Sequence, residues 1–525
     1  MHAGRPRAVC PSIDDPSAIG NAYARYLKDE SNLIGGLPRR LLFPRSVDEL
    51  AEGVRTACQR GESLTVCGGR TGIVGGAVPV GGESLLCLDA LVADPVLRYS
   101  ERHDCWSVRV KPGTSLDSLT AFLAAPRQGG PSPGGELFYP VDPTEGSATL
   151  GGTVATNASG SRTLFFGPTR AWVLGLTVVL ADGSVARLER GETGCRDGLL
   201  RVPLLPDSPS GDEISLRVPA VRMPRTKHVA GYHLSPDMEP IDLFIGGEGT
   251  LGIVAEIDLR LCGKPAHLFA LSVFAPSSLS AWDLASALGS DEELRPLALE
   301  FMDGNSLELL RAYRAEAGEA SGVPVLPDAI GALLYVEYAY PDEPALDRLV
   351  ETVRGRLSAA GVPEDATWAA FEDSEREAMR KMRHALPERV NALIARRKES
   401  IPEITKLSTD LAVPGPRFSE MLGIYSRLLD ESGLQHVVFG HIGDAHLHVN
   451  ILPRDSAEVA RGKEVTVLLA REAVRLGGSV SGEHGIGKLK KHLMEIQYPE
   501  ADRAALRALK TRLDPDGRLN PGVLW

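Results

Sequence analysis

Residues 143–167 read PTEGSATLGGTVATNASGSRTLFFG, and this stretch does most to decide the fold. Its residues are mostly small, and glycine has no Cβ to hold a neighbour away, so the backbone can approach a flat ligand closely. A second stretch, VCGGRTGIVGGAVP at 66–79, predicts a loop whose backbone N–H groups converge on an anion such as a phosphate. Each stretch by itself is equally compatible with a plain glycine-rich turn.

A third stretch, GGEGTLG at 246–252, contains the spacing GxGxxG of dinucleotide-binding proteins. In that motif the last glycine opens a helix. The residues that follow here, IVAEIDLRL, alternate between apolar and polar as a strand does. The context therefore argues against a nucleotide-binding domain of the Rossmann type.

The pattern of predicted secondary structure changes along the chain. Up to about residue 262, short β-branched runs alternate with glycine-rich turns, and residues 48–62 predict an amphipathic helix closed by glycine. Beyond this point a strand followed by a helix recurs, which is typical of an α+β sheet with helices on one face. We expect four parts: an N-terminal segment 1–40, a glycine-rich domain 41–262, a second domain 263–465 and a C-terminal segment 466–525.

Composition excludes several classes of protein. The net charge of −12 over 525 residues gives no basic surface for nucleic acid. The seven cysteines form no CxxC pair, which argues against iron–sulfur clusters, cysteine-held zinc and a disulfide framework. We expect a cytoplasmic protein without a secretory signal. No run of ~18 apolar residues predicts a membrane span, so any membrane contact would be peripheral, at the inner face.

Histidines and an acid gather in two glycine-flanked stretches, GHIGDAHLHVN at 440–450 and SGEHGIGK at 481–488. Strand alternation places His446 and His448 on one face, with His441 opposite unless the turn between them resets the parity. Imidazole with carboxylate is the ligand mix of zinc or manganese sites. On spacing alone these residues are compatible with polar surface strands or with a metal-dependent hydrolase, with Glu483 or His484 as its base.

Taken in order, the three glycine-rich stretches together with FFGPTRAWVLGLTVVLADG and GYHL resemble the FAD-binding domain of vanillyl-alcohol oxidase type flavoproteins. Within that superfamily, the chain is most similar to the D-lactate, glycolate and D-2-hydroxyglutarate dehydrogenase group, from about residue 40 to the C-terminus. The resemblance implies an α+β fold with a two-part FAD-binding domain and a cap domain whose antiparallel sheet is covered by helices. It also implies that the C-terminal segment packs on the FAD domain and completes the active site.

The resemblance implies non-covalent FAD and a set of cofactor contacts. These are Gly68, Gly69, Arg70, Thr71, Gly72, Pro140, Asp142, Thr149, Gly152, Asn157, Ala158, Gly160, Glu248, Gly252, Ile253 and Asn520. Two features depart from the family pattern. Arg70 stands where many relatives have a third glycine, so its guanidinium either assists the phosphate contacts or points to solvent. The final motif reads LNPGVLW, which retains Asn520 but lacks the lysine that usually ends it.

By the same resemblance, the histidine motifs hold a divalent metal, zinc or manganese, through His441, His448 and Glu483, with His484 as the base. His446 stands where the family has asparagine, and Ala445 where it has glycine. The substrate carboxylate is expected at Arg383, in REAMRKMRHALPERVN at 376–391. Asn450 is expected to hydrogen-bond the substrate. Lys406 is a weaker candidate because its offset from Asp410 differs from that in relatives.

The implied activity is oxidation of a D-2-hydroxy acid to the 2-oxo acid. Hydride would pass from C2 to flavin N5 and the hydroxyl proton to His484, while the metal polarises the hydroxyl. D-lactate or glycolate ranks first as substrate, and D-2-hydroxyglutarate is the alternative. No NAD-binding unit is evident, so a quinone, a cytochrome, an electron-transfer flavoprotein or oxygen would accept the electrons; a homodimer is also expected. Rival interpretations are a non-redox flavoenzyme of the alkyl-dihydroxyacetone-phosphate synthase type, a metal-dependent hydrolase, and a flavin-binding subunit of a larger complex.

Overall fold

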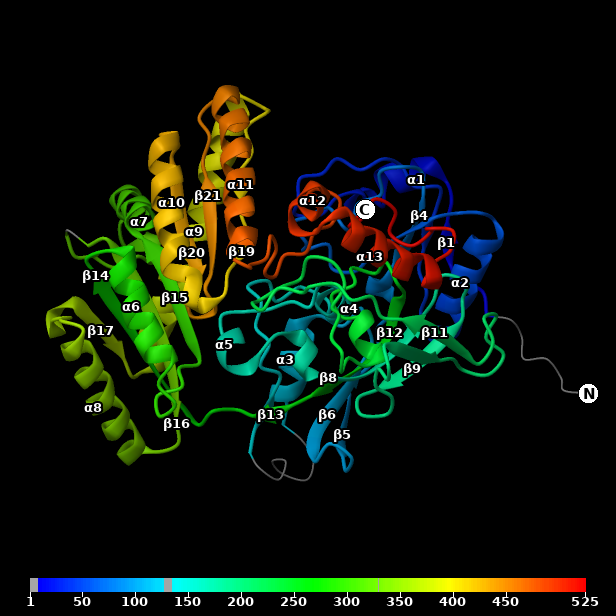
Figure 1. The fold of residues 1–525 in the computed structure, drawn as a ribbon, viewed down its shortest axis with the longest axis horizontal. Helices are drawn as coiled ribbons and strands as arrows, with labels where there is room; N and C mark the ends of the chain where they lie inside the picture. The colour runs from blue at the N-terminus through cyan, green and yellow to red at the C-terminus, as the bar shows by residue number, and fades with distance from the viewer. Residues whose placement is uncertain (1–7, 127–134, 329) are drawn as a thin grey trace, which may run out of the picture.

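The computed structural model describes residues 8–126, 135–328 and 330–525. Residues 1–7 of the expected N-terminal segment lie outside this description. Figure 1 shows two lobes side by side. The glycine-rich lobe contains residues 8–263 and the C-terminal residues 476–525, and the cap lobe contains residues 264–475. None of the helices in the described parts of the chain combines the length and the apolar character that a membrane span requires.

The glycine-rich lobe begins with a small sheet in the order β1-β2-β4-β3, in which β2, β4 and β3 run parallel. The strands are β1 (Ser12–Ile13), β2 (Leu41–Leu42), β3 (Leu64–Cys67) and β4 (Ser84–Cys87), with α1 (Pro16–Asn21) and α2 (Val47–Gln59) beside them. The side chain of Ser46 caps α2, and Gly61 follows the helix with a φ of 68°. The helix predicted at 48–62 is thus confirmed.

A second, antiparallel sheet of this lobe has the order β5-β6-β12-β8-β9. Its strands are β5 (Val96–Ser100), β6 (Cys105–Val110), β8 (Val173–Val179), β9 (Val185–Glu189) and β12 (Ile253–Arg260). The central β12 follows GEGTLG directly, so a strand stands where a nucleotide-binding domain would open a helix. The remaining elements are α3 (Leu116–Ala124), β7 (Leu137–Phe138), α4 (Leu150–Thr156), α5 (Thr163–Phe166), β10 (Leu199–Pro203), β11 (Glu213–Arg217) and β13 (Cys262–Gly263).

The cap lobe is built on one antiparallel sheet in the order β17-β14-β16-β15-β20-β21-β18, with β19 also paired to β21. The strands are β14 (His267–Ala275), β15 (Ala298–Asp303), β16 (Ala332–Tyr340), β17 (Thr367–Ala370), β18 (Leu407–Ser408), β19 (Leu411–Ala412), β20 (His436–His441) and β21 (His446–Ile451). Its helices are α6 (Ser278–Gly289), α7 (Gly304–Ala317), α8 (Glu343–Ala359), α9 (Asp373–Ser400) and α10 (Phe418–Ser432).

Helices cover both faces of the cap sheet, not the single face expected. Leu334 and Val336 of β16 share one apolar cluster with α6, α8 and α10, whereas the intervening Leu333 and Tyr335 share another with α7 and α9. Because every second residue of a strand points to the same face, both faces of β16 are apolar and both require a cover.

The C-terminal part of the chain passes from the cap lobe back to the glycine-rich lobe (Figure 1). α11 (Ser456–Arg475) lies on the cap sheet beside α10, so the expected boundary at residue 465 falls inside a helix. α12 (Met494–Gln497) and α13 (Glu500–Leu513) then lie on the glycine-rich lobe. Near the end, Asn520 accepts a hydrogen bond from the backbone of Val66 at 2.6 Å and donates one to the carbonyl of Glu248 at 2.6 Å.

Candidate active site

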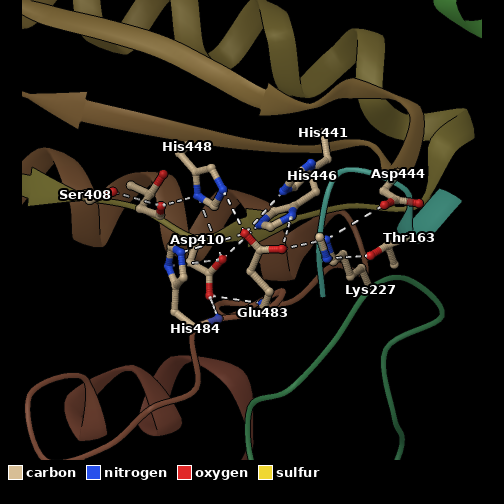
Figure 2. A network of polar contacts seen from close by, with 12 residues as sticks. Thr163, Lys227, Ser408, Asp410, His441, Asp444, His446, His448, Glu483 and His484 are labelled. Atoms are coloured by element: carbon tan, nitrogen blue, oxygen red, sulfur yellow. Dashed lines mark hydrogen bonds and ion pairs between the residues drawn. The ribbon is translucent and has the colours of Figure 1, made fainter. Parts of the chain in front are cut away.

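The hairpin of β20 and β21 brings three histidines together (Figure 2). A turn at Ile442–Asp444 and a left-handed residue, Ala445, connect the strands, so that His441 stands opposite His446 in the ladder. Residues opposite each other in a sheet point to the same face, which places His441 beside His446 and His448. The turn therefore resets the parity, as the sequence analysis required for the three to meet.

Glu483 meets two of these imidazoles from the stretch that follows α11. Its Oε1 lies 3.3 Å from Nε2 of His441 and 3.1 Å from Nε2 of His448. Ligand atoms that bind one zinc-like ion at about 2.0–2.2 Å lie roughly 3.0–3.5 Å from one another. The three residues thus offer one face of a coordination shell, and their nitrogen and oxygen donors suit a divalent transition metal.

The far nitrogens of both imidazoles are held by acceptors of the cap lobe. Nδ1 of His441 lies 2.6 Å from Oε1 of Glu300, and Nδ1 of His448 lies 3.2 Å from the carbonyl of Thr409. Such acceptors fix the Nδ1–H tautomer and leave Nε2 free as a ligand. Burial lowers the pKa of His441, but Glu300 and Glu483 outweigh burial and raise that pKa to about 9. A metal ion and a proton would therefore compete for Nε2 of His441.

Lys227 neutralises the other oxygen of Glu483. Its Nζ lies 2.7 Å from Oε2 of Glu483 and 3.8 Å from Asp444. Figure 2 shows Lys227 between these two carboxylates. Burial alone would raise the pKa of Glu483, but the charges of Lys227 and His441 hold it well below its usual range. Glu483 is thus a carboxylate with one oxygen, Oε1, directed at the imidazoles.

Asp410 organises the loop that carries Glu483 and His484. Its carboxylate accepts hydrogen bonds from the backbone N–H of His484 at 2.8 Å, from that of Glu483 at 3.2 Å and from the Ser481 hydroxyl at 2.6 Å. It also lies 2.8 Å from Nε2 of His446. Burial alone would raise its pKa, but the imidazoles and Lys490 hold that pKa well below its usual range. One buried carboxylate therefore joins the two halves of the site.

His446 is fully buried beneath this cluster. Its Nε2 faces Asp410, whereas its Nδ1 has no hydrogen-bond partner among the described residues and lies 4.0 Å from Oε2 of Glu483. Burial lowers the pKa of His446 to about 4, so the ring is neutral. Gly482 makes room for it, because a Cβ at that position would stand 2.8 Å from Nε2 of His446. His446 is thus a further neutral donor within the group of potential ligands.

His484 stacks on His448 with ring centroids 4.9 Å apart. Its Nδ1 lies 3.5 Å from Asp410, and its Nε2 lies 3.8 Å from Oε1 of Glu483. Burial lowers the pKa of His484 to about 3, so its imidazole is neutral. It also belongs, with Asp410, His448 and Glu483, to a second group of residues that could hold an ion.

A cavity of about 190 Å³ lies against this cluster, between the two lobes. His441, His448, Glu483 and His484 line it together with the sequence-predicted Arg383, Asn450 and Lys406. Nε and Nη2 of Arg383 lie 3.1 and 2.9 Å from Glu300, which fixes the guanidinium at the wall. The amide of Asn450 donates to the carbonyl of His448 at 3.2 Å, and Lys406 donates to Asn391 at 3.0 Å.

The first glycine-rich loop offers free backbone donors. In the described part of the chain, no protein acceptor takes a hydrogen bond from the backbone N–H groups of residues 70–77. Added Cβ atoms at Gly72 and Gly76 would meet nothing within 4 Å, so the loop borders open space. A run of free N–H groups along a glycine-rich loop fits the pyrophosphate of FAD.

Arg70 neither points to solvent nor lies free for a phosphate. Its backbone has a φ of 62°, a conformation that favours the glycine common among relatives. Its guanidinium lies 3.3 Å from Asp89 and 4.4 Å from the ring centre of Tyr26. The Arg70 side chain thus stabilises the loop through its contacts with Asp89 and Tyr26.

The other predicted cofactor residues lie in neighbouring segments that are joined by hydrogen bonds. Gly69 donates to the Thr149 hydroxyl at 3.1 Å, and Glu248 donates from its backbone to α4 at Ala155. The Glu248 carboxylate accepts from the backbone N–H groups of Ile486 and Gly487. Thr71 belongs to the first loop; Gly152, Asn157, Ala158 and Gly160 lie on or just after α4; Pro140 and Asp142 lie between β7 and α4; Gly252 and the buried Ile253 adjoin β12.

Three charged residues of the site, Glu300, Asp410 and Lys227, were not predicted from the sequence. Glu300 is a lone acid in the otherwise apolar start of β15, ALEF, and this mismatch was a usable signal. Asp410 entered only as a reference point for Lys406. Lys227 lies in an irregular segment without a motif, so nothing local indicates its role.

The fold and these loops together define a class of flavoprotein. Residues 264–524 match the family model described as FAD linked oxidases, C-terminal domain, and residues 38–189 match the one described as FAD binding domain. The chain belongs to this FAD-linked oxidase family, and the resemblance inferred from the motifs is confirmed.

Named relatives span nearly the whole chain. D-2-hydroxyglutarate dehydrogenase of Xanthomonas citri is 30% identical over 495 residues, which cover 93% of this chain and 89% of the relative. Glycolate oxidase subunit GlcD of Bacillus subtilis is 27% identical, with 98% and 94% covered, and D-lactate dehydrogenase of Anaerostipes hadrus is 28% identical, with 95% and 92% covered.

Solved structures agree on the fold. The 4-ethylphenol oxidase of Gulosibacter chungangensis has a TM-score of 0.63 and 18% identity, with 98% of this chain and 94% of that chain covered. An alkyldihydroxyacetonephosphate synthase has a TM-score of 0.61 and 14% identity, with 97% and 83% covered. At these identities the likeness concerns the fold alone. It confirms the expected α+β class with an FAD-binding domain and a cap.

Proposed function

We propose that the protein oxidises a D-2-hydroxy acid to the 2-oxo acid at the cavity between the lobes, with D-lactate and glycolate as the simplest substrates. The observation that carries the proposal is the convergence of His441, His448 and Glu483 on a cavity that Arg383 also lines. A 2-hydroxy acid presents a carboxylate and a hydroxyl on adjacent carbons, which matches an arginine beside a metal-ligating cluster. The relatives named for these acids support the same reaction class.

The bound groups supply what the side chains lack. Bound FAD would accept a hydride, and a divalent cation held by His441, His448 and Glu483 would stabilise the negative charge that develops on the substrate oxygen. In the net reaction the C2–H bond breaks with its electron pair leaving as hydride, the O–H bond breaks and a C=O bond forms. Zinc or manganese suits the ligand set.

The side chains orient the substrate and take its proton. Arg383, fixed by Glu300, binds the carboxylate, and Asn450 donates a hydrogen bond to the substrate from the same wall. His484 accepts the hydroxyl proton at Nε2, the nitrogen nearer Glu483. Its neutral imidazole is in the protonation state that a base requires. Electrons would leave through a quinone, a cytochrome or an electron-transfer flavoprotein.

D-2-hydroxyglutarate is the second candidate substrate. Lys406 lines the same cavity and offers a second cation, and a relative named for this acid covers most of the chain. Comparing D-2-hydroxyglutarate with D-lactate at equal concentration separates the two candidates.

The test is anaerobic stopped-flow reduction of the purified flavoprotein by D- and L-2-hydroxy acids, before and after chelation. We expect bleaching by D-acids only, and a large loss of rate after chelation that added metal restores. His484→Ala should slow reduction by about 10²–10⁴-fold, whereas the matched change at the exposed His492 should have no effect. Absence of bleaching by every 2-hydroxy acid would refute the proposed activity, and a colourless protein would favour the hydrolase.

A further inference from the structure

The cavity has a second wall that the proposed chemistry does not use. It lies beside the metal-ligating cluster, because Met302 and Phe439 stand two residues from Glu300 and His441 on their strands, and it consists of side chains from β15, β16, β20 and α9. Its apolar members are Met302, Leu333, Met379, Met382, Pro387 and Phe439. Three of the six are methionines, whose flexible thioethers adapt to irregular apolar ligands.

One face of α9 joins this wall to the carboxylate site. Met379, Met382, Arg383 and Pro387 are spaced three, four and eight residues from the first, and such residues lie along one side of a helix. A substrate whose carboxylate rests on Arg383 therefore has apolar side chains above and below it.

Charged partners for a second carboxylate are scarce. Apart from histidine, the cations among the described lining residues are Arg383 and Lys406. Arg383 holds the first carboxylate, and Lys406 already donates to Asn391 at 3.0 Å. Burial lowers the pKa of Lys406. A carboxylate against the methionine wall would lose its hydration without gaining a full partner.

The apolar wall is also larger than a two- or three-carbon acid needs. Lactate extends a single methyl group from C2, which leaves most of the six apolar side chains without a contact.

We propose that the methionine wall is a subsite for the side chain of a monocarboxylic D-2-hydroxy acid of about five to nine carbons, branched aliphatic or aromatic. This inference rests on the proposed function and specifies its substrate class. The side chain fills the space between Met302 and Met382 while the carboxylate stays on Arg383. Each buried methylene strengthens binding, so specificity should rise with apolar length until the cavity is full.

The test compares kcat/KM of the holoenzyme, with an artificial electron acceptor, for D-lactate, D-2-hydroxy-4-methylpentanoate, D-3-phenyllactate and D-2-hydroxyglutarate. The methylpentanoate adds three carbons to lactate, and we expect its kcat/KM to be at least about 30-fold higher. D-2-hydroxyglutarate should rank below D-lactate. The gain should appear mainly in KM, because the added atoms lie away from the reacting bond.

Two substitutions at Met382 locate the subsite. Met382→Ala should lower kcat/KM for the methylpentanoate by about tenfold or more and leave D-lactate within about threefold. Met382→Lys should reverse the order of the methylpentanoate and D-2-hydroxyglutarate. The matched control is Met421→Ala, because Met421 is equally buried in the cap lobe but lies in α10, away from the cavity. Activity on D-lactate reports folding in every variant.

Separate outcomes refute this inference and the proposed function. If D-lactate reduces the flavin but the methylpentanoate is within threefold of it, or D-2-hydroxyglutarate is preferred, the apolar subsite is refuted and the reaction class stands. If Met421→Ala changes the preference as much as Met382→Ala does, the wall is not the cause and the subsite is again refuted. If no D-2-hydroxy acid reduces the flavin, both proposals are refuted.

Discussion

Replacing Glu300 with glutamine tests how the cap lobe prepares the metal ligands. Oε1 of Glu300 accepts the hydrogen bond from Nδ1 of His441 at 2.6 Å, and Oε2 lies 2.9 Å from Arg383. The side chain is only 5% exposed. Glutamine keeps its shape but removes the charge that makes the imidazole a stronger ligand. The perturbation therefore acts on the metal through His441 alone.

The size of the effect follows from that contact. A hydrogen bond to a charged group contributes about 1.5–3 kcal/mol, and loss of a carboxylate behind a ligating histidine typically weakens metal binding by about 10–100-fold. At 1.36 kcal/mol per decade this range is about 1.4–2.7 kcal/mol, so the two estimates agree. We expect Glu300→Gln to weaken zinc binding by about 10–100-fold at a pH above about 9, where no proton competes for Nε2 of His441. At lower pH the loss should be smaller, because the substitution also lowers the His441 pKa and so weakens the competition from the proton.

The assay is competition for Zn²⁺ between the metal-free protein and a chromophoric chelator. Glu337→Gln is the matched control: Glu337 is an equally buried acid of the neighbouring β16, paired at 2.6 Å with Arg162, and it touches no histidine of the site. Unchanged zinc affinity in Glu300→Gln, or an equal loss in the control, would refute the reasoning.

Three further predictions address the site and its scaffold. His446→Asn, which restores the residue of relatives, should weaken zinc affinity in the same competition assay by about tenfold if Nδ1 contributes to the metal, whereas an unchanged affinity assigns the ring to packing alone. Asp242→Asn should cost about 3–5 kcal/mol in urea unfolding at pH 7, because it leaves the buried Arg170 without its carboxylate partner and removes the closer of the two carboxylates that pair with Arg190. Burial alone would raise the pKa of Asp242, but these arginines hold that pKa well below its usual range. The stabilisation by Asp242 is therefore present above about pH 4, and the difference in unfolding free energy between wild type and Asp242→Asn should shrink as the pH falls further. A difference that stays constant with pH would contradict this. Asn520→Ala should lower the free energy of unfolding by about 2 kcal/mol through the loss of two hydrogen bonds, and an unchanged thermal midpoint would count against it.

Local patterns in the sequence predict much of this molecule. The helix at 48–62 and the strand after GEGTLG follow from period and turn residues, and both are confirmed. The histidine hairpin can also be predicted from the sequence, because Gly443 and Asp444 indicate a turn between two short strands. These features depend on residues close together in the chain.

Contacts between residues that are far apart in the sequence cannot be predicted from local patterns. Lys227 meets Glu483 over a separation of 256 positions, and Glu300 meets His441 over 141. A single charged residue carries no periodic signal, and its partner is set only when distant segments pack together within a lobe, as Lys227 and Glu483 do in the glycine-rich lobe and Glu300 and His441 do in the cap lobe. The second helix-covered face of the cap sheet is missed for a related reason: an unbroken apolar strand such as ALLYV predicts burial without saying what covers each side.

The hydrogen bond from Val66 to Asn520 also has a consequence for the nascent chain during synthesis. β3 is the edge strand of its sheet, and its outer side is completed by the segment at Arg518–Asn520, where Leu64 donates to the carbonyl of Arg518 at 2.8 Å. Val66 and Asn520 are 454 positions apart. At roughly 5–20 residues per second, a ribosome needs about 20–90 s to cover that interval. Throughout that time the nascent chain carries an unpaired strand edge, the kind of surface that pairs with other chains. Premature termination near the 3′ end of the message should therefore yield a product that aggregates, and not merely a shorter protein.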